Sequence, residues 1–116
     1  MESQYPTLVH RNRHGDAALK ATVRTMNEET GAEAYLRQQQ AIMTRADSRP
    51  TLATIKCPTL VLVGDSDEAT PPDLAREMAA AIPGANLVVV PECGHLSTIE
   101  RPQAVNKALV GLMQGF

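Results

Sequence analysis

The chain has 116 residues, a formal net charge of −2 and a hydrophobic content of 43%. Charges of both signs are mixed along it, which excludes the basic stripe of a nucleic-acid-binding protein and the polybasic patch of a membrane-binding one. Two cysteines are too few for a disulfide scaffold, and there is neither an apolar signal core nor a membrane-spanning run, so we predict a soluble, cytoplasmic protein.

The N-terminal part is predicted to contain a helix after an irregular start. Residues 1–14 are polar and irregular, and we interpret them as the remnant of a loop that connects two helices. Asp16 can cap the helix that follows, and Gly31 can end it in the left-handed conformation that helix C-termini favour. The apolar face of this helix repeats at spacings of four and three residues. It consists of Leu19, Val23 and Met26.

A second helix is predicted over residues 32–44, closed by Ser48-Arg49-Pro50. Its apolar residues recur at helical spacing. They are Tyr35, Leu36, Ile42 and Met43.

The C-terminal part reads as two buried strands joined by a helix. Residues 59–63 and 86–90 are short apolar runs rich in β-branched residues, typical of strands buried on both faces. The helical pattern of residues 73–82 lies between them and stops at Pro83-Gly84. Such a β-α-β unit has parallel strands and a right-handed crossover. The fold class is therefore α/β.

A closing helix is predicted after Glu100, with Pro102 in its first turn, where the missing amide hydrogen costs nothing. Its apolar face should pack on the sheet. This face consists of Val105, Ala108, Leu109 and Leu112.

An acid and a histidine follow the two strands. Asp67 comes after the first, and Gly94-His95 comes after the second. Because the carboxyl ends of parallel strands share one edge, where ligand chemistry is concentrated in open α/β sheets, Asp67 and His95 should lie within reach of each other. The pair can act as an orienting acid and a general base.

These turns resemble the C-terminal part of an α/β-hydrolase, close to the lactonase and esterase branch that includes 3-oxoadipate enol-lactonase. In that family the triad acid lies in a GxxD turn, here residues 64–67, and the histidine lies in a GH dipeptide, here Gly94-His95. The resemblance implies Asp67 as triad acid and His95 as triad base. The likeness is strong from about residue 48 onward, and the order of acid before histidine fits the family.

The resemblance also implies a division of the chain. Residues 1–50 would be a helical cap, and residues 51–116 the C-terminal β-α-β-α part of the hydrolase domain. Because a cap of this kind covers the site, four side chains are candidates for lining a pocket for a small-molecule ester or lactone. They are Tyr35, Gln39, Ile42 and Met43. The alternative is that these side chains pack one helix on the other.

The nucleophile of the family is absent from the sequence. The family places a serine in GxSxG, on a strained turn beside oxyanion-hole amides, and no GxSxG occurs here. Cys93 lies close to His95, but no oxyanion hole is evident behind it, and Cys57 precedes the first strand. None of the serines lies between a buried strand and a helix with flanking glycines. They are Ser3, Ser48, Ser66 and Ser97. The chain is therefore expected to be catalytically incomplete by itself.

A metal site is the alternative interpretation of the carboxylates near the first strand. Asp65, Asp67 and Glu68 place three carboxylates within four residues, a set that could bind calcium or magnesium, although no supporting oxygen-rich loop is visible. The histidines and cysteines lack paired zinc-ligand spacing such as CxxC or HExxH. We therefore predict no metal and no cofactor.

The strands that precede residues 59–63 in the family are missing from this chain. One edge of that strand should then lack its neighbour, and a second copy could pair there, so we predict a homodimer that completes the sheet. Two functions remain open. The chain is the C-terminal part of a hydrolase of esters, lactones or related C–C bonds, or it is a non-catalytic half-domain that oligomerises or binds a small molecule.

Overall fold

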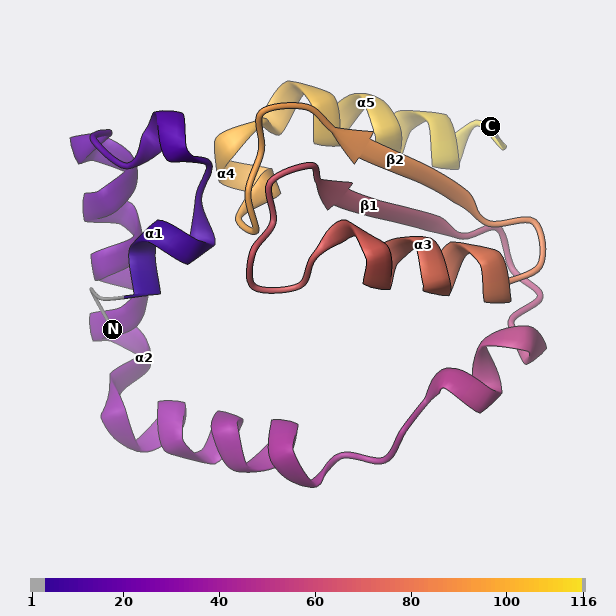
Figure 1. The fold of residues 1–116 in the computed structure, drawn as a ribbon, viewed down its shortest axis with the longest axis horizontal. Coiled ribbons are helices and arrows are strands. Elements are labelled where there is room, and N and C mark those ends of the chain that lie inside the picture. The colour runs from indigo at the N-terminus through magenta and orange to yellow at the C-terminus, as the bar shows by residue number, and fades with distance from the viewer. Residues whose placement is uncertain (1–3, 116) are drawn as a thin grey trace.

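The computed structural model describes residues 4–115. Its core is a two-stranded parallel sheet with a helix on each face, preceded by a helical N-terminal region (Figure 1). In chain order the elements are α1 (Tyr5–Leu8), the 3-10 helix η2 (Arg11–Arg13), α2 (Ala17–Thr44), the 3-10 helix η3 (Arg49–Thr54), β1 (Leu60–Gly64), α3 (Pro72–Ala81), β2 (Asn86–Val90), α4 (Ser97–Glu100) and α5 (Pro102–Met113).

The sheet confirms the predicted β-α-β unit. Strands β1 and β2 pair in parallel, from Leu60 opposite Asn86 to Gly64 opposite Val90, and α3 forms the crossover. The second strand has the predicted bounds, while β1 and α3 each differ from the predicted ranges by one residue. The described elements therefore form an α/β fold, as the sequence predicted.

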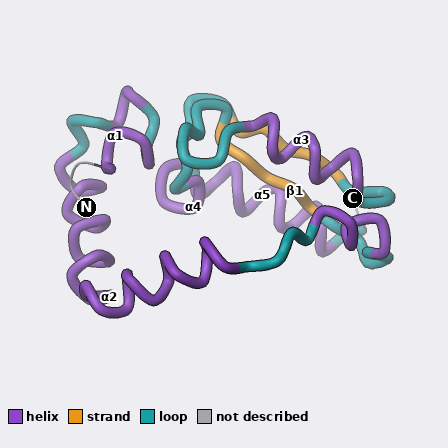
Figure 2. Tube along the Cα trace, turned by 60° about the horizontal axis from the view of Figure 1, so that its bottom comes forward, coloured by secondary structure: helices purple, strands orange, loops and turns teal. Residues whose placement is uncertain are grey.

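The two faces of the sheet are not equally covered. Val61 and Val63 are buried in a cluster with Ala75 of α3 and Ile82. Leu60 and Leu62, which alternate with these valines along β1, are only half-buried, so the prediction of burial on both faces holds for one face. The sheet order is β1–β2, so within residues 4–115 each strand also has one edge without a strand partner (Figure 2).

Helix α2 is two helices joined at Gly31, as the sequence predicted. Gly31 has φ 77° and ψ 160°, so its φ is positive but its ψ is not that of the left-handed helical region, which corrects the expected conformation. Before the kink, Leu19 and Val23 are buried. After the kink, residues 32–44 lie apart from the sheet (Figures 1 and 2).

The irregular start predicted for residues 1–14 is wrong where the structure describes it, from residue 4. Helix α1 and η2 fold against α2, and Tyr5 and Val9 are buried in one cluster with Leu19 and Val23. The Tyr5 hydroxyl donates a hydrogen bond to the Arg13 carbonyl at 3.0 Å. A four-residue helix is too short to show a hydrophobic period, so only packing against α2 reveals it.

Two further short helices, η3 and α4, were also not predicted. Each has six residues or fewer, and neither begins with a side-chain cap that would have marked it. No helix within residues 4–115 is both long and apolar enough to cross a membrane.

Candidate active site

The turn after β1 is joined to the loop after β2 by backbone hydrogen bonds. The Asp65 amide donates to the Val90 carbonyl at 2.9 Å, and the Ser66 amide donates to the Cys93 carbonyl at 2.8 Å. The Asp67 amide closes the turn by donating to the Gly64 carbonyl at 3.2 Å. These bonds continue the contact between the two strands beyond the sheet and place Asp67 beside the loop that carries His95.

Asp67 and His95 meet as the sequence predicted. Asp67 is only 6% exposed, and its Oδ2 lies 3.0 Å from Nδ1 of His95. The His95 side chain is 38% exposed, so one part of the ring is held by the acid while another part reaches solvent. A neutral imidazole that donates Nδ1–H to Asp67 keeps its lone pair on Nε2, which is the arrangement of a general base.

Thr70 completes the surroundings of the acid. Its amide donates to Asp67 Oδ1 at 2.8 Å, and its hydroxyl donates to Oδ2 at 3.1 Å. The same hydroxyl lies 3.2 Å from His95 Nδ1. Sequence reasoning missed Thr70, although an aspartate followed three residues later by threonine is a pattern in which side chains satisfy nearby backbone groups.

The pair opens onto a small cavity of about 150 Å³ at the carboxyl end of β1. Its lining combines polar groups of the site with apolar side chains of β1 and α3. The lining residues are Leu62, Val63, Gly64, Asp67, Thr70, Leu74, Ala75, Met78, His95 and Ser97. The mixture suits a ligand that is apolar apart from its reacting group.

Ser97 and Cys93 are the serine and the cysteine nearest to His95 in the sequence. Ser97 lines the cavity together with His95, whose ring nitrogen Nδ1 contacts Asp67 and Thr70. Cys93 is fully buried, and burial raises the pKa of its thiol to about 11. At neutral pH it is therefore a thiol, whereas the thiolate is the nucleophilic form.

The three neighbouring carboxylates do not converge on a common point. Asp65 Oδ1 accepts hydrogen bonds from the Cys93 amide at 3.2 Å and from the Ser66 hydroxyl at 2.9 Å. Burial raises the pKa of the Asp65 carboxyl, but the hydrogen bonds from the Cys93 and Glu92 amides outweigh it and leave the pKa lowered. Asp67 is engaged by Thr70 and His95. Among the residues that the structure describes, no three His, Cys, Asp or Glu side chains form a group that could hold a metal ion.

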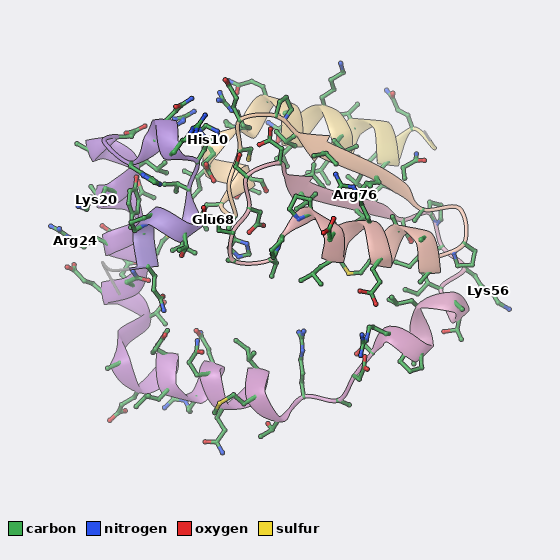
Figure 3. The ribbon with its side chains drawn as sticks, viewed as in Figure 1. His10, Lys20, Arg24, Lys56, Glu68 and Arg76 are labelled. Carbon is green, nitrogen blue, oxygen red and sulfur yellow. The ribbon has the colours of Figure 1, made fainter. Side chains whose placement is uncertain are left out.

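A wider polar hollow of about 810 Å³ lies between the N-terminal residues and the turn after β1. His10 lines the hollow from the N-terminal region, and Glu68 lines it from the turn after β1. Both residues are labelled in Figure 3. Asp67 also borders this hollow, in addition to the small cavity that it shares with His95.

The four residues predicted to line the substrate pocket are not brought to this site. Tyr35 and Gln39 are half-buried, whereas Ile42 is 56% exposed and Met43 is 78% exposed. None of them lines the cavity that Asp67 and His95 share. Their role in substrate binding stays a prediction.

Comparison with known proteins gives a consistent result. A model of the alpha/beta hydrolase family matches residues 3–108. The structure is similar to a thermophilic esterase from Thermogutta terrifontis, with a TM-score of 0.91 and 30% identity over 98% of this chain and 42% of that one. It is also similar to the enol-lactonase from Burkholderia xenovorans LB400, with a TM-score of 0.88 and 32% identity over 97% of this chain and 43% of that one.

A curated relative, 3-oxoadipate enol-lactonase 2 of Acinetobacter baylyi, is 35% identical over 85 residues, which cover 73% of this chain and 31% of that protein. The chain thus spans less than a third of the length of this relative.

Proposed function

Because the chain belongs to the α/β-hydrolase family, we propose that it carries the acid and the base of a catalytic triad for the hydrolysis of carbon esters or lactones. The observation that supports this most directly is the 3.0 Å contact between buried Asp67 and Nδ1 of His95, at the carboxyl ends of adjacent parallel strands. Asp67 would hold the imidazole ring of His95 in place, and His95 would act as a base through Nε2.

The proposed chemistry requires a nucleophilic serine, and the GxSxG motif that carries it in the family does not occur in this sequence. His95 Nε2 would take the proton of that hydroxyl as it attacks the ester carbonyl, and would return it to the leaving alcohol. Asp67 would stabilise the imidazolium formed in between. The family supplies the hydroxyl and the oxyanion hole from GxSxG and a preceding loop, neither of which occurs among the 116 residues.

We therefore expect the isolated chain to hydrolyse an activated ester such as p-nitrophenyl acetate no faster than free imidazole at the same concentration. Loss of even one oxyanion-hole donor costs roughly a hundredfold or more in rate, and here the nucleophile is missing as well. Release of p-nitrophenol, followed by absorbance, measures this rate. The matched control is His95→Ala, which should leave the rate unchanged. A burst of p-nitrophenol that disappears in His95→Ala would contradict the prediction.

The exposed surfaces favour a second, non-catalytic candidate function. One edge of β1 has no strand partner within residues 4–115, and Leu36, Ile42 and Met43 of α2 are exposed apolar side chains. Unpaired backbone groups and apolar side chains of this kind are commonly covered by association. A half-domain that oligomerises or binds a small molecule would use these surfaces rather than the Asp67–His95 pair.

We expect the chain to form a homodimer in solution through the free edge of β1. Pairing of two copies would satisfy backbone amides and carbonyls that otherwise face solvent. Light scattering coupled to gel filtration would give a mass twice that of the chain across a range of loading concentrations. A monodisperse monomer at all concentrations would count against the dimer and against this candidate function.

The division of the chain and its location are also proposals. Residues 1–50 would form a cap segment over the site, and residues 51–116 would belong to the catalytic domain. The substrate would be a small ester or lactone, and the reducing cytoplasm is the location that the two unpaired cysteines favour.

A further inference from the structure

Glu100, at the end of α4, is a buried carboxylate that the proposed reaction does not use. Only 1% of the residue is exposed. Its Oε1 accepts two backbone hydrogen bonds, from the Gly94 amide at 3.0 Å and from the His10 amide at 2.8 Å. Within residues 4–115 its Oε2 has no hydrogen-bond partner. A carboxylate oxygen buried without a hydrogen-bond partner is costly, so the presence of Glu100 here calls for a reason beyond packing.

The two amides come from opposite ends of the chain. Gly94 directly precedes His95, and His10 belongs to the N-terminal region, 90 residues away from Glu100 in sequence. One carboxylate oxygen therefore ties the histidine loop to the N-terminal region. The Arg13 guanidinium adds a third link, because it donates to the backbone carbonyl of Glu100 at 2.7 Å.

The other side of His95 is held by the same N-terminal region. The Leu8 carbonyl accepts hydrogen bonds from the amides of His95, at 2.9 Å, and Leu96, at 3.1 Å. Gly94 packs so closely on this segment that an added Cβ would lie 2.7 Å from the Val9 carbonyl carbon. The backbone on both sides of His95 is thus fixed by residues 8–10 and by Glu100.

We propose that Glu100 is a positioning residue for His95, acting with residues 8–10 to hold the histidine loop where Nδ1 meets Asp67 Oδ2. This inference rests on the proposed function in that it takes His95 as the base. Its physical basis is that a histidine on a loop keeps a 3.0 Å contact only if its backbone is fixed, and a misplacement of about 1 Å can cost roughly a hundredfold in rate. Glu100 touches neither the imidazole nor Asp67, so its action is indirect.

The test is proton NMR of the 116-residue chain, with the His95 Nδ1–H resonance as the readout. In the wild-type chain this proton should be visible and protected from exchange, because Asp67 accepts it. Glu100→Ala removes the acceptor shared by the Gly94 and His10 amides. We expect the His95 resonance to disappear and these two amides to exchange at least about tenfold faster, while the amides of β1 and β2 keep their protection.

Two milder substitutions cover the possibility that Glu100→Ala does not fold. Glu100→Gln keeps an acceptor oxygen in place and should retain the His95 resonance. Glu100→Asp withdraws the carboxylate by one methylene group and should lose the resonance in a folded protein. The matched control is Glu77→Ala, which removes a half-exposed carboxylate whose partner is Arg49, and should change neither signal.

The outcomes separate this inference from the function on which it rests. If the wild-type chain lacks a protected Nδ1–H, the Asp67–His95 pair itself fails, and the positioning role falls with it. If the wild-type chain has the signal and a folded Glu100→Ala or Glu100→Asp variant keeps it with unchanged Gly94 exchange, the pair stands and the positioning role is overturned. Loss of the signal in a folded Glu100→Gln variant would likewise overturn the role assigned to the acceptor oxygen.

Discussion

A hybrid that adds the upstream part of a related esterase to this chain should be an active esterase whose rate depends on Asp67. The upstream part of the Thermogutta terrifontis esterase, ending where this chain begins to align, would be fused before Met1. That esterase is suited because its fold superposes over 98% of the chain at a TM-score of 0.91. In the hybrid, Asp67→Asn should lower kcat by about 10⁴-fold, the loss seen when the acid of a serine-protease triad becomes an amide.

The physical reason lies in the hydrogen bonds around the acid. Oδ2 of Asp67 accepts from Nδ1 of His95, and asparagine can present an NH₂ group there instead of an acceptor. The ring is then favoured in the tautomer that has its proton on Nε2, and it no longer acts as a base toward the nucleophile. The Thr70 contacts, at 2.8 Å and 3.1 Å, hold the acid in position and do not replace its charge.

Steady-state kinetics on p-nitrophenyl acetate measure this effect. The matched control is Asp73→Asn, the same substitution at an exposed carboxylate in α3 that pairs with Arg76. This control should stay close to the wild-type hybrid. A folded hybrid in which Asp67→Asn and Asp73→Asn are equally active would remove Asp67 from the proposed triad.

The sequence predicted the β-α-β unit well because its signals are local. Each strand is an apolar run that ends at a glycine or a proline, and the helix between them starts and stops at prolines. Parallel pairing then follows from the helical crossover between the strands, and the meeting of Asp67 with His95 follows from parallel pairing. The errors in this part are shifts of one residue at element ends, where helices and strands are least sharply defined, and the burial predicted for both faces of the first strand.

The N-terminal region could not be predicted because its structure depends on distant partners. Tyr5 and Val9 are apolar residues in a polar stretch, and they become core residues only through packing against Leu19 and Val23. The hydrogen bond from the His10 amide to Glu100 joins residues 90 positions apart in the sequence, so no local sequence pattern predicts it. A segment that looked like a remnant loop therefore turned out to contact the histidine loop directly.

Among the glycine-to-alanine substitutions of this chain, we expect Gly64→Ala to lower the free energy of unfolding the most. A Cβ built on Gly64 would lie 2.3 Å from the carbonyl oxygens of both Cys93 and Gly94. These are backbone atoms of the histidine loop, so the clash cannot be relieved by rotating a side chain. Overpacking of this kind typically costs about 1–3 kcal/mol and occasionally more, and we expect the upper end, about 3 kcal/mol.

The loop cannot move away without breaking the bonds that build the site. The Cys93 carbonyl accepts the Ser66 amide at 2.8 Å, and the Gly94 amide is held by Glu100. A folded Gly64→Ala variant should therefore also lose the 3.0 Å contact between His95 and Asp67. Thermal unfolding followed by circular dichroism would show a melting temperature lower by more than about 10 °C for a domain of this size.

Gly111→Ala is the matched control, because a Cβ on Gly111 in α5 meets no heavy atom within 4 Å. Replacing a glycine within a helix by alanine should stabilise the protein by about 0.5–1 kcal/mol. The two variants must be compared at one protein concentration, since association would make the melting temperature depend on it. Equal melting temperatures for Gly64→Ala and the wild-type chain would mean that the turn after β1 and the histidine loop are not in the close contact on which the Asp67–His95 pair depends.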